Sequence, residues 1–270
     1  MSEAFMRAAR ATSSDGAAAI VGGWTDGDLD PSVSEHDGDA VIRLGIRHAV
    51  LGRLPSPTAS LSPAVLEAGP GARFVVTPPP APTTAQLRDL AAQGVCGVRI
   101  AVPGNAEAAR TEMESALRYA DRIVPFGWHV ELALDATAEL APHEWALMRL
   151  PVATCISGIA PLVAQGGDEA ETSFLLELLR LGRTWIRLPG RVAATDDDGM
   201  AAFVRAAAAI RPDRLVWGSG PPAPGRDGGA HVADALATLV RWLPDAAVRA
   251  AVLGDNPARL YGFVTGAAPA

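Results

Sequence analysis

The stretch GVRIAVPGNAEAARTEMESALRYADRIVPFGWHVELAL, residues 97–134, contains one complete strand–helix–strand unit. Its two ends, Gly97–Val102 and His129–Leu134, are short and nearly unbroken in their apolar character, which is typical of strands covered on both faces. The stretch between them, Ala106–Asp121, places its apolar residues on one face at helical spacing. Two parallel strands need a crossover of this length, so the pattern predicts a parallel pair.

The same unit repeats along the chain. Six further short apolar runs are present: Ala19–Trp24, His48–Leu54, Arg73–Pro78, Val152–Gly158, Thr184–Gly190 and Leu215–Gly220. Helical patterns follow several of them, at Thr172–Leu181, Asp198–Ile210 and His231–Leu243. Eight such units predict an α/β fold, a single closed (β/α)8 TIM barrel.

An open, doubly wound sheet is the alternative architecture. Such a sheet normally has fewer strands, and no GxGxxG motif follows the first apolar run. No linker or repeat divides the chain, so we expect one domain over residues 17–265. Residues 1–16 are small and polar, and we expect them to form a flexible N-terminal tail.

The composition excludes several classes of protein. The formal net charge is −7 over 270 residues and no basic run is present, so we expect no nucleic-acid partner. All 23 residues counted as lysine or arginine are arginines, which excludes a lysine Schiff base. No apolar run is long enough to cross a membrane, and Cys96 and Cys155 lie far apart. These features favour a cytoplasmic protein without a membrane contact.

Several segments carry a more specific signal than the repeating units. They are GVCGVRI (94–100), GWHVEL (127–132), TWIRLPG (184–190), RPDRLVWGSGPP (211–222) and DNPARLYGF (255–263). In this order and spacing they resemble the amidohydrolase-related family that includes the 2-pyrone-4,6-dicarboxylate lactonases and sugar lactonases. The resemblance implies an amidohydrolase-like barrel whose members hydrolyse lactones, some with a divalent metal. It also implies that an aspartate ending strand eight activates water and that histidines bind the metal or polarise the carbonyl.

This sequence departs from the family pattern at those positions. The histidine pair of the first strand is absent from Ile20–Trp24, the histidine of strand six is Ile156, and the aspartate of strand eight is Gly220. None of these side chains can bind a metal or accept a proton. We therefore expect no metal and no other cofactor. A new metal site built from His129, Glu131 and Asp26 or Asp28 is the alternative.

The residues that remain at the expected mouth suggest another chemistry. Glu131 is the best candidate for a catalytic acid or base, and Arg53, Arg99 and Arg187 are candidates for binding a negatively charged substrate. The alternative is structural, because the arginines would then pair with a buried acid such as Glu131.

The resulting hypothesis is a metal-independent hydrolase that opens a lactone or related C–O bond of a small anionic molecule. Its alternative is a catalytically inactive barrel, a pseudoenzyme that binds a ligand or supports a partner subunit. That partner is a second copy of the chain or a paralogue. The C-terminal DNPARLYGF is interpreted as structural: Asp255 or Asn256 caps the last helix, and Tyr261 and Phe263 pack it against the barrel.

Overall fold

The computed structural model describes residues 18–21, 46–53, 72–77, 81–163, 169–193, 196–220 and 228–263. The expected tail, residues 1–16, lies outside them. Eight strands are present, one within or overlapping each predicted run: β1 (Ala18–Val21), β2 (Ile46–Arg53), β3 (Ala72–Val76), β4 (Val95–Val102), β5 (His129–Leu134), β6 (Thr154–Ser157), β7 (Thr184–Pro189) and β8 (Leu215–Gly218).

The strands form one curled sheet in which neighbours in sequence are neighbours in space, in the order β1 to β8. Every described ladder is parallel. β1 and β8 also lie close together, and helix α11 (Ala246–Leu253) contacts both. The protein therefore has the parallel α/β architecture that the repeating units predict.

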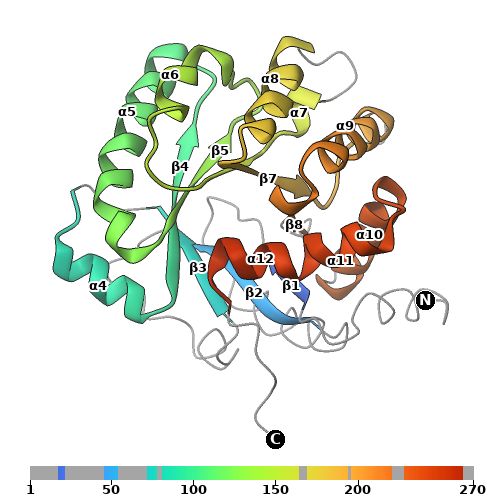
Figure 1. The fold of residues 1–270 in the computed structure, drawn as a ribbon, viewed down its shortest axis with the longest axis horizontal. Helices are drawn as coiled ribbons and strands as arrows, with labels where there is room; N and C mark the ends of the chain where they lie inside the picture. The colour runs from blue at the N-terminus through green and yellow to red at the C-terminus, as the bar shows by residue number, and fades with distance from the viewer. Residues whose placement is uncertain are drawn as a thin grey trace, which may run out of the picture.

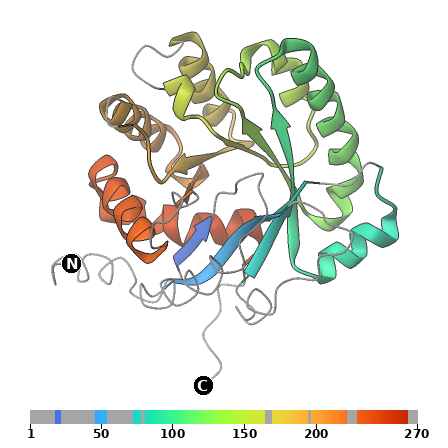
Figure 2. The same ribbon diagram turned by 180° about the vertical axis from the view of Figure 1, so that it is seen from behind.

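Helices cover the outer face of the curled sheet, as Figures 1 and 2 show from opposite sides. Those of eight or more residues are α4 (Thr84–Ala92), α5 (Ala106–Ile123), α8 (Glu169–Arg180), α9 (Asp197–Ile210), α10 (Gly228–Trp242) and α11. Short elements lie between them: α6 (Glu144–Leu147), α7 (Ala160–Val163), and the 3-10 turns η2 (Val124–Phe126), η3 (Ala141–His143) and η5 (Pro212–Arg214). Helix α12 (Asp255–Tyr261) is the last described element. No helix of the described part has the length and apolarity that crossing a membrane requires.

Helix boundaries follow local signals in the sequence. At α4, Thr83 and Gln86 form a reciprocal capping box, in which the Thr83 hydroxyl accepts from the Gln86 backbone N–H at 3.2 Å and the Gln86 side chain accepts from the Thr83 N–H at 2.8 Å. At α5, the Asn105 side chain accepts from the backbone N–H of Ala108. The predicted face of α5, which includes Met113, is buried against the sheet.

The two faces of the sheet contribute to two separate cores. One core joins alternate strand residues such as Val130, Leu132 and Ile186 to the covering helices. The other contains Cys155 and Trp185 from the opposite face together with Tyr261. Because side chains alternate along a strand, this second set lies on the concave face.

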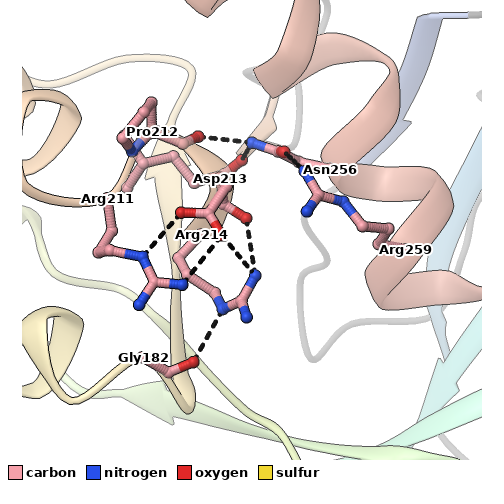
Figure 3. Close-up of polar contacts among 8 residues, drawn as sticks. Gly182, Arg211, Pro212, Asp213, Arg214, Asn256 and Arg259 are labelled. Carbon is pink, nitrogen blue, oxygen red and sulfur yellow. Dashed lines mark hydrogen bonds and ion pairs between the residues drawn. The ribbon is translucent and has the colours of Figure 1, made fainter.

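The C-terminal segment differs in one respect from its interpretation. The residue that precedes α12 is Gly254, and no side chain caps the helix. Asn256 is instead fully buried and donates from Nδ2 to the carbonyl oxygens of Pro212, at 2.7 Å, and Leu215, at 2.8 Å (Figure 3). The expected cap is therefore wrong, because this amide satisfies carbonyls of the chain entering β8. The expected packing role of Tyr261 and Phe263 is confirmed.

Candidate functional site

The candidate site lies on the concave face, where register brings residues of neighbouring strands together. Arg99 of β4 is opposite Glu131 of β5, and Glu131 is opposite Cys155 of β6. Cys155 in turn is opposite Trp185 of β7. Arg187 follows Trp185 by two residues, so its side chain leaves β7 on the same face.

Glu131 is the centre of this cluster, and its Oε1 receives three contacts. Arg187 Nη2 approaches it at 3.1 Å, Arg99 Nη1 lies at 3.8 Å, and the Ser157 hydroxyl donates to it at 2.8 Å. The Glu131 side chain is 1% exposed, while those of Arg187 and Arg99 are 11% and 26% exposed. The arginines therefore connect a buried carboxylate to the more accessible part of the site.

The surroundings keep Glu131 ionised at neutral pH. Burial by itself would raise the pKa of the carboxyl, but the charges of Arg187 and Arg99 and the Ser157 hydrogen bond together hold it below its usual value. Glu131 in turn raises the pKa of Arg187 against the opposing effect of burial. The cluster is thus one anion and two cations, with a net positive charge facing outward.

His129 lies two residues before Glu131 on the same face of β5. Its Nδ1 is 3.0 Å from the carbonyl oxygen of Cys96, so Nδ1 carries the proton and Nε2 presents a lone pair. Burial lowers the pKa of His129 to about 4, which Glu131 only partly opposes. The ring fits because residue 97 is glycine: a Cβ there would lie 2.4 Å from His129 Cε1.

Tyr261 reaches this interior from α12. Its ring meets the His129 ring edge to face, with centroids 5.3 Å apart, and it belongs to the same buried cluster as Cys155. Burial raises the pKa of the Tyr261 hydroxyl and of the Cys155 thiol, and it raises the pKa of Cys96 to about 12. Both cysteines are therefore thiols at neutral pH, and neither is an activated nucleophile.

The structure brings together three of the four sequence-predicted site residues: Glu131, Arg99 and Arg187. The fourth, Arg53, ends β2, and its side chain lies outside the described residues. The structural alternative is also observed, since both described arginines pair with Glu131. Ser157, the last residue of β6, is not among the sequence-predicted site residues. Ser157 lies two residues after Cys155, on the face of β6 that is next to Glu131. This spacing is the sequence signal that could have placed Ser157 beside Glu131.

The divalent metal that the family resemblance implies does not fit the described residues of this site. Two guanidinium groups adjoin the Glu131 carboxylate, so a cation placed there would be repelled. Within the described ranges, no group of three His, Cys, Asp or Glu side chains is placed to hold a metal ion. Asp26 and Asp28 lie outside those ranges.

Comparison with known proteins gives this geometry its context. A family model described as amidohydrolase matches residues 64–263. The chain belongs to the amidohydrolase family. The 4-sulfomuconolactone hydrolase of Hydrogenophaga intermedia is 29% identical to it over 247 residues, which is 83% of this chain and 77% of the relative.

Two other proteins are also similar to this chain. D-galactarolactone isomerase of Agrobacterium fabrum is 37% identical over 101 residues, 35% of each chain. The crystal structure of a probable 2-pyrone-4,6-dicarboxylic acid hydrolase from Acinetobacter baumannii superposes with a TM-score of 0.69 at 19% identity, covering 92% of this chain and 100% of that one. The amidohydrolase-like fold and the lactonase-like character of the relatives agree with the resemblance drawn from the sequence motifs.

Proposed function

We propose that this amidohydrolase-family protein hydrolyses a lactone or a related C–O bond of a small anionic substrate without a metal ion. The observation that carries the proposal is the pair of arginines around one buried carboxylate on the concave face. Related proteins are named for lactones, and 4-sulfomuconolactone carries a sulfonate. An acidic substrate of this kind suits a site with net positive charge.

The roles follow from the accessibility and the charge of each group. Arg99 and Arg187 bind the anionic group and stabilise the negative charge that develops on the carbonyl oxygen. We assign a third cationic contact to Arg53 from its place at the end of β2. The contacts to Glu131 from the described residues go to Oε1, and we assign Oε2 the role of accepting a proton from the attacking water. Water adds to the carbonyl carbon, the ring C–O bond breaks, and that proton passes to the leaving oxygen, which gives a hydroxy acid.

Turnover of 4-sulfomuconolactone and D-galactarolactone by the purified chain tests this proposal. We expect Glu131→Gln to lower kcat by about 100-fold or more, because the variant cannot accept the proton. Arg99→Ala should mainly raise KM. Arg110→Ala, which removes an exposed arginine from α5, is the matched control and should leave both constants unchanged. Wild-type turnover that survives both site substitutions would refute the assignment.

A second candidate function is a ligand-binding or scaffold subunit without catalysis. It is favoured by the saturation of Glu131 Oε1 by Arg187, Arg99 and Ser157, because this lowers the basicity of the carboxylate. A second copy or a paralogue would then be the partner. Wild-type protein that binds the lactones but turns none of them over would favour this candidate, whereas turnover by an isolated monomer would exclude it.

The proposed site also depends on whether the curled sheet is closed. We propose that the curled sheet closes between β8 and β1 into a (β/α)8 barrel and that residues 17–265 form this single domain. The closeness of β1 to β8 and the contact of α11 with both support the closure. In such a barrel the carboxyl ends of all strands meet at one mouth, which would include the end of β2 and Arg53.

A further inference from the structure

A hollow of about 290 Å³ lies at the opposite end of the strands from their carboxyl termini. Its lining includes His129, where β5 begins, and Val152, which precedes β6. Trp185, the second residue of β7, forms another part of the wall, and Arg259 and Leu260 line it from α12. The hollow is therefore built from the amino-terminal ends of the strands and is separate from the proposed lactone site.

Two parts of this wall are held in place by the polar network of Figure 3. The Arg214 guanidinium stacks over the Trp185 ring, 4.8 Å from its centroid. Arg214 is fixed by Asp213 at 2.8 Å and by the Gly182 carbonyl oxygen at 2.9 Å. A stacked and bonded guanidinium of this kind holds the neighbouring indole in one position before any ligand arrives.

Arg259 gives the hollow its charge. Its Nη2 donates to Asn256 Oδ1 at 2.9 Å, and Asn256 is itself anchored to the carbonyls of Pro212 and Leu215. A guanidinium has five N–H donors in a rigid fork, so this bond, the one it makes within the described residues, uses only one of them. No acidic residue is among those described as lining the hollow. Asp213, the acid of the network, is occupied by Arg211 and Arg214.

We propose that this hollow is a binding site for a small carboxylate with a flat apolar body. The carboxylate binds the Arg259 fork, and the body lies against Trp185, Val152 and Leu260. A guanidinium beside an indole and aliphatic side chains suits such a ligand. The guanidinium pairs with the carboxylate, while the apolar body of the ligand is removed from water. The proposal is independent of the lactone hydrolysis assigned to the Glu131 cluster.

Titration of the full chain with benzoate, followed by the indole N–H signals in a ¹H–¹⁵N spectrum, tests the proposal. The Trp185 signal is assigned with Trp185→Phe. We expect it to shift and saturate with a Kd of roughly 1 mM. Benzyl alcohol, which lacks the charge, should bind more weakly. Arg259→Gln should raise the Kd for benzoate by about 10-fold or more, and Arg259→Lys should recover part of the loss.

Two further variants keep the result unambiguous. Val152→Phe fills the hollow and leaves Arg259 in place, so it should abolish the Trp185 shift even if Arg259→Gln destabilises the chain. Arg187→Gln removes a cation from the other site and should leave benzoate binding unchanged. A Trp185 signal that does not move, or a shift that survives both Arg259→Gln and Val152→Phe, would overturn the proposal. Loss of the shift in Arg187→Gln would assign the ligand to the Glu131 cluster instead.

Discussion

Glu131 shows at the scale of one residue how a buried charge is maintained in this protein. It is the one acidic side chain in the eight described strands. Burial of a carboxylate is unfavourable unless it is paired and hydrogen-bonded, and here Arg187, Arg99 and Ser157 supply that compensation. The same contacts lower the basicity of Glu131, so Glu131→Gln is the decisive test of its proposed role as the proton acceptor.

His129 contributes to the pH dependence of stability on the acid side. Its pKa is about 4 in the folded chain, against 6.5 when unperturbed. Between these values the unfolded chain binds more protons, so the free energy of unfolding falls as the pH drops through this window, by up to about 3 kcal/mol. The lowered pKa of Glu131 acts in the same direction, with a contribution that is lost only at lower pH, as the pH falls through the folded value.

We expect His129→Asn to flatten the fall in stability between about pH 6.5 and 4, because the amide does not titrate. Denaturant unfolding across this range measures the slope. Thr83→Ala is the control: it weakens the cap of α4 and should lower stability equally at each pH. An unchanged slope in His129→Asn would mean that another group causes the acid loss.

At the scale of the element, α12 covers the amino-terminal end of the sheet. Tyr261 inserts from this helix beside His129, and Arg73 of β3 donates to the Gly262 carbonyl oxygen just after it, at 3.2 Å. Asn256 joins the start of the same helix to the chain entering β8. One short helix therefore packs against His129, next to the Glu131 cluster, and also forms one side of the hollow.

We expect Asn256→Ala to lower the free energy of unfolding by about 2–3 kcal/mol. The substitution leaves the part-buried carbonyl oxygen of Pro212 and the buried one of Leu215 without their donor. Asp245→Ala, which removes the exposed side-chain cap of α11, should cost only about 1 kcal/mol. Urea denaturation of the two variants measures the difference. Equal losses in the free energy of unfolding would show that the Asn256 hydrogen bonds stabilise the chain less than we expect.

At the scale of the whole molecule, the proposed barrel depends on how β1 and β8 meet. An open sheet leaves the outer backbone groups of these two strands unpaired, whereas closure pairs them. The position of α11 over both strands holds them together from outside. A closed ring would fix the stagger of all eight strands and so the distances between residues at the mouth.

Hydrogen exchange measures this closure directly. We expect the backbone amides of β1 and β8 that face each other to exchange about as slowly as those of β4 and β5, since all would open only with the whole sheet. Amides within the β4–β5 ladder are the internal reference. Fast exchange confined to one side of β1 or β8 would indicate an open sheet and would remove the basis for placing Arg53 at a common mouth.

The sequence by itself determined the types of the elements, their order and their parallel arrangement. This was possible because each strand and helix is a local pattern, as residues 97–134 show, and because parallel neighbours require a crossover. It also singled out Glu131, Arg99 and Arg187 as candidate site residues, since a charged side chain in an otherwise apolar strand is conspicuous. The family followed from short segments whose spacing is retained.

Only the tertiary structure decided how these residues act on one another. The contact of Glu131 with Arg187 depends on strand register across β5, β6 and β7, which no local pattern specifies. The protonation of His129 depends on a carbonyl of β4 and on the absence of a side chain at Gly97. The hollow at Arg259 exists because α12 folds back over strands far away in the sequence, and such contacts arise from packing rather than from propensity.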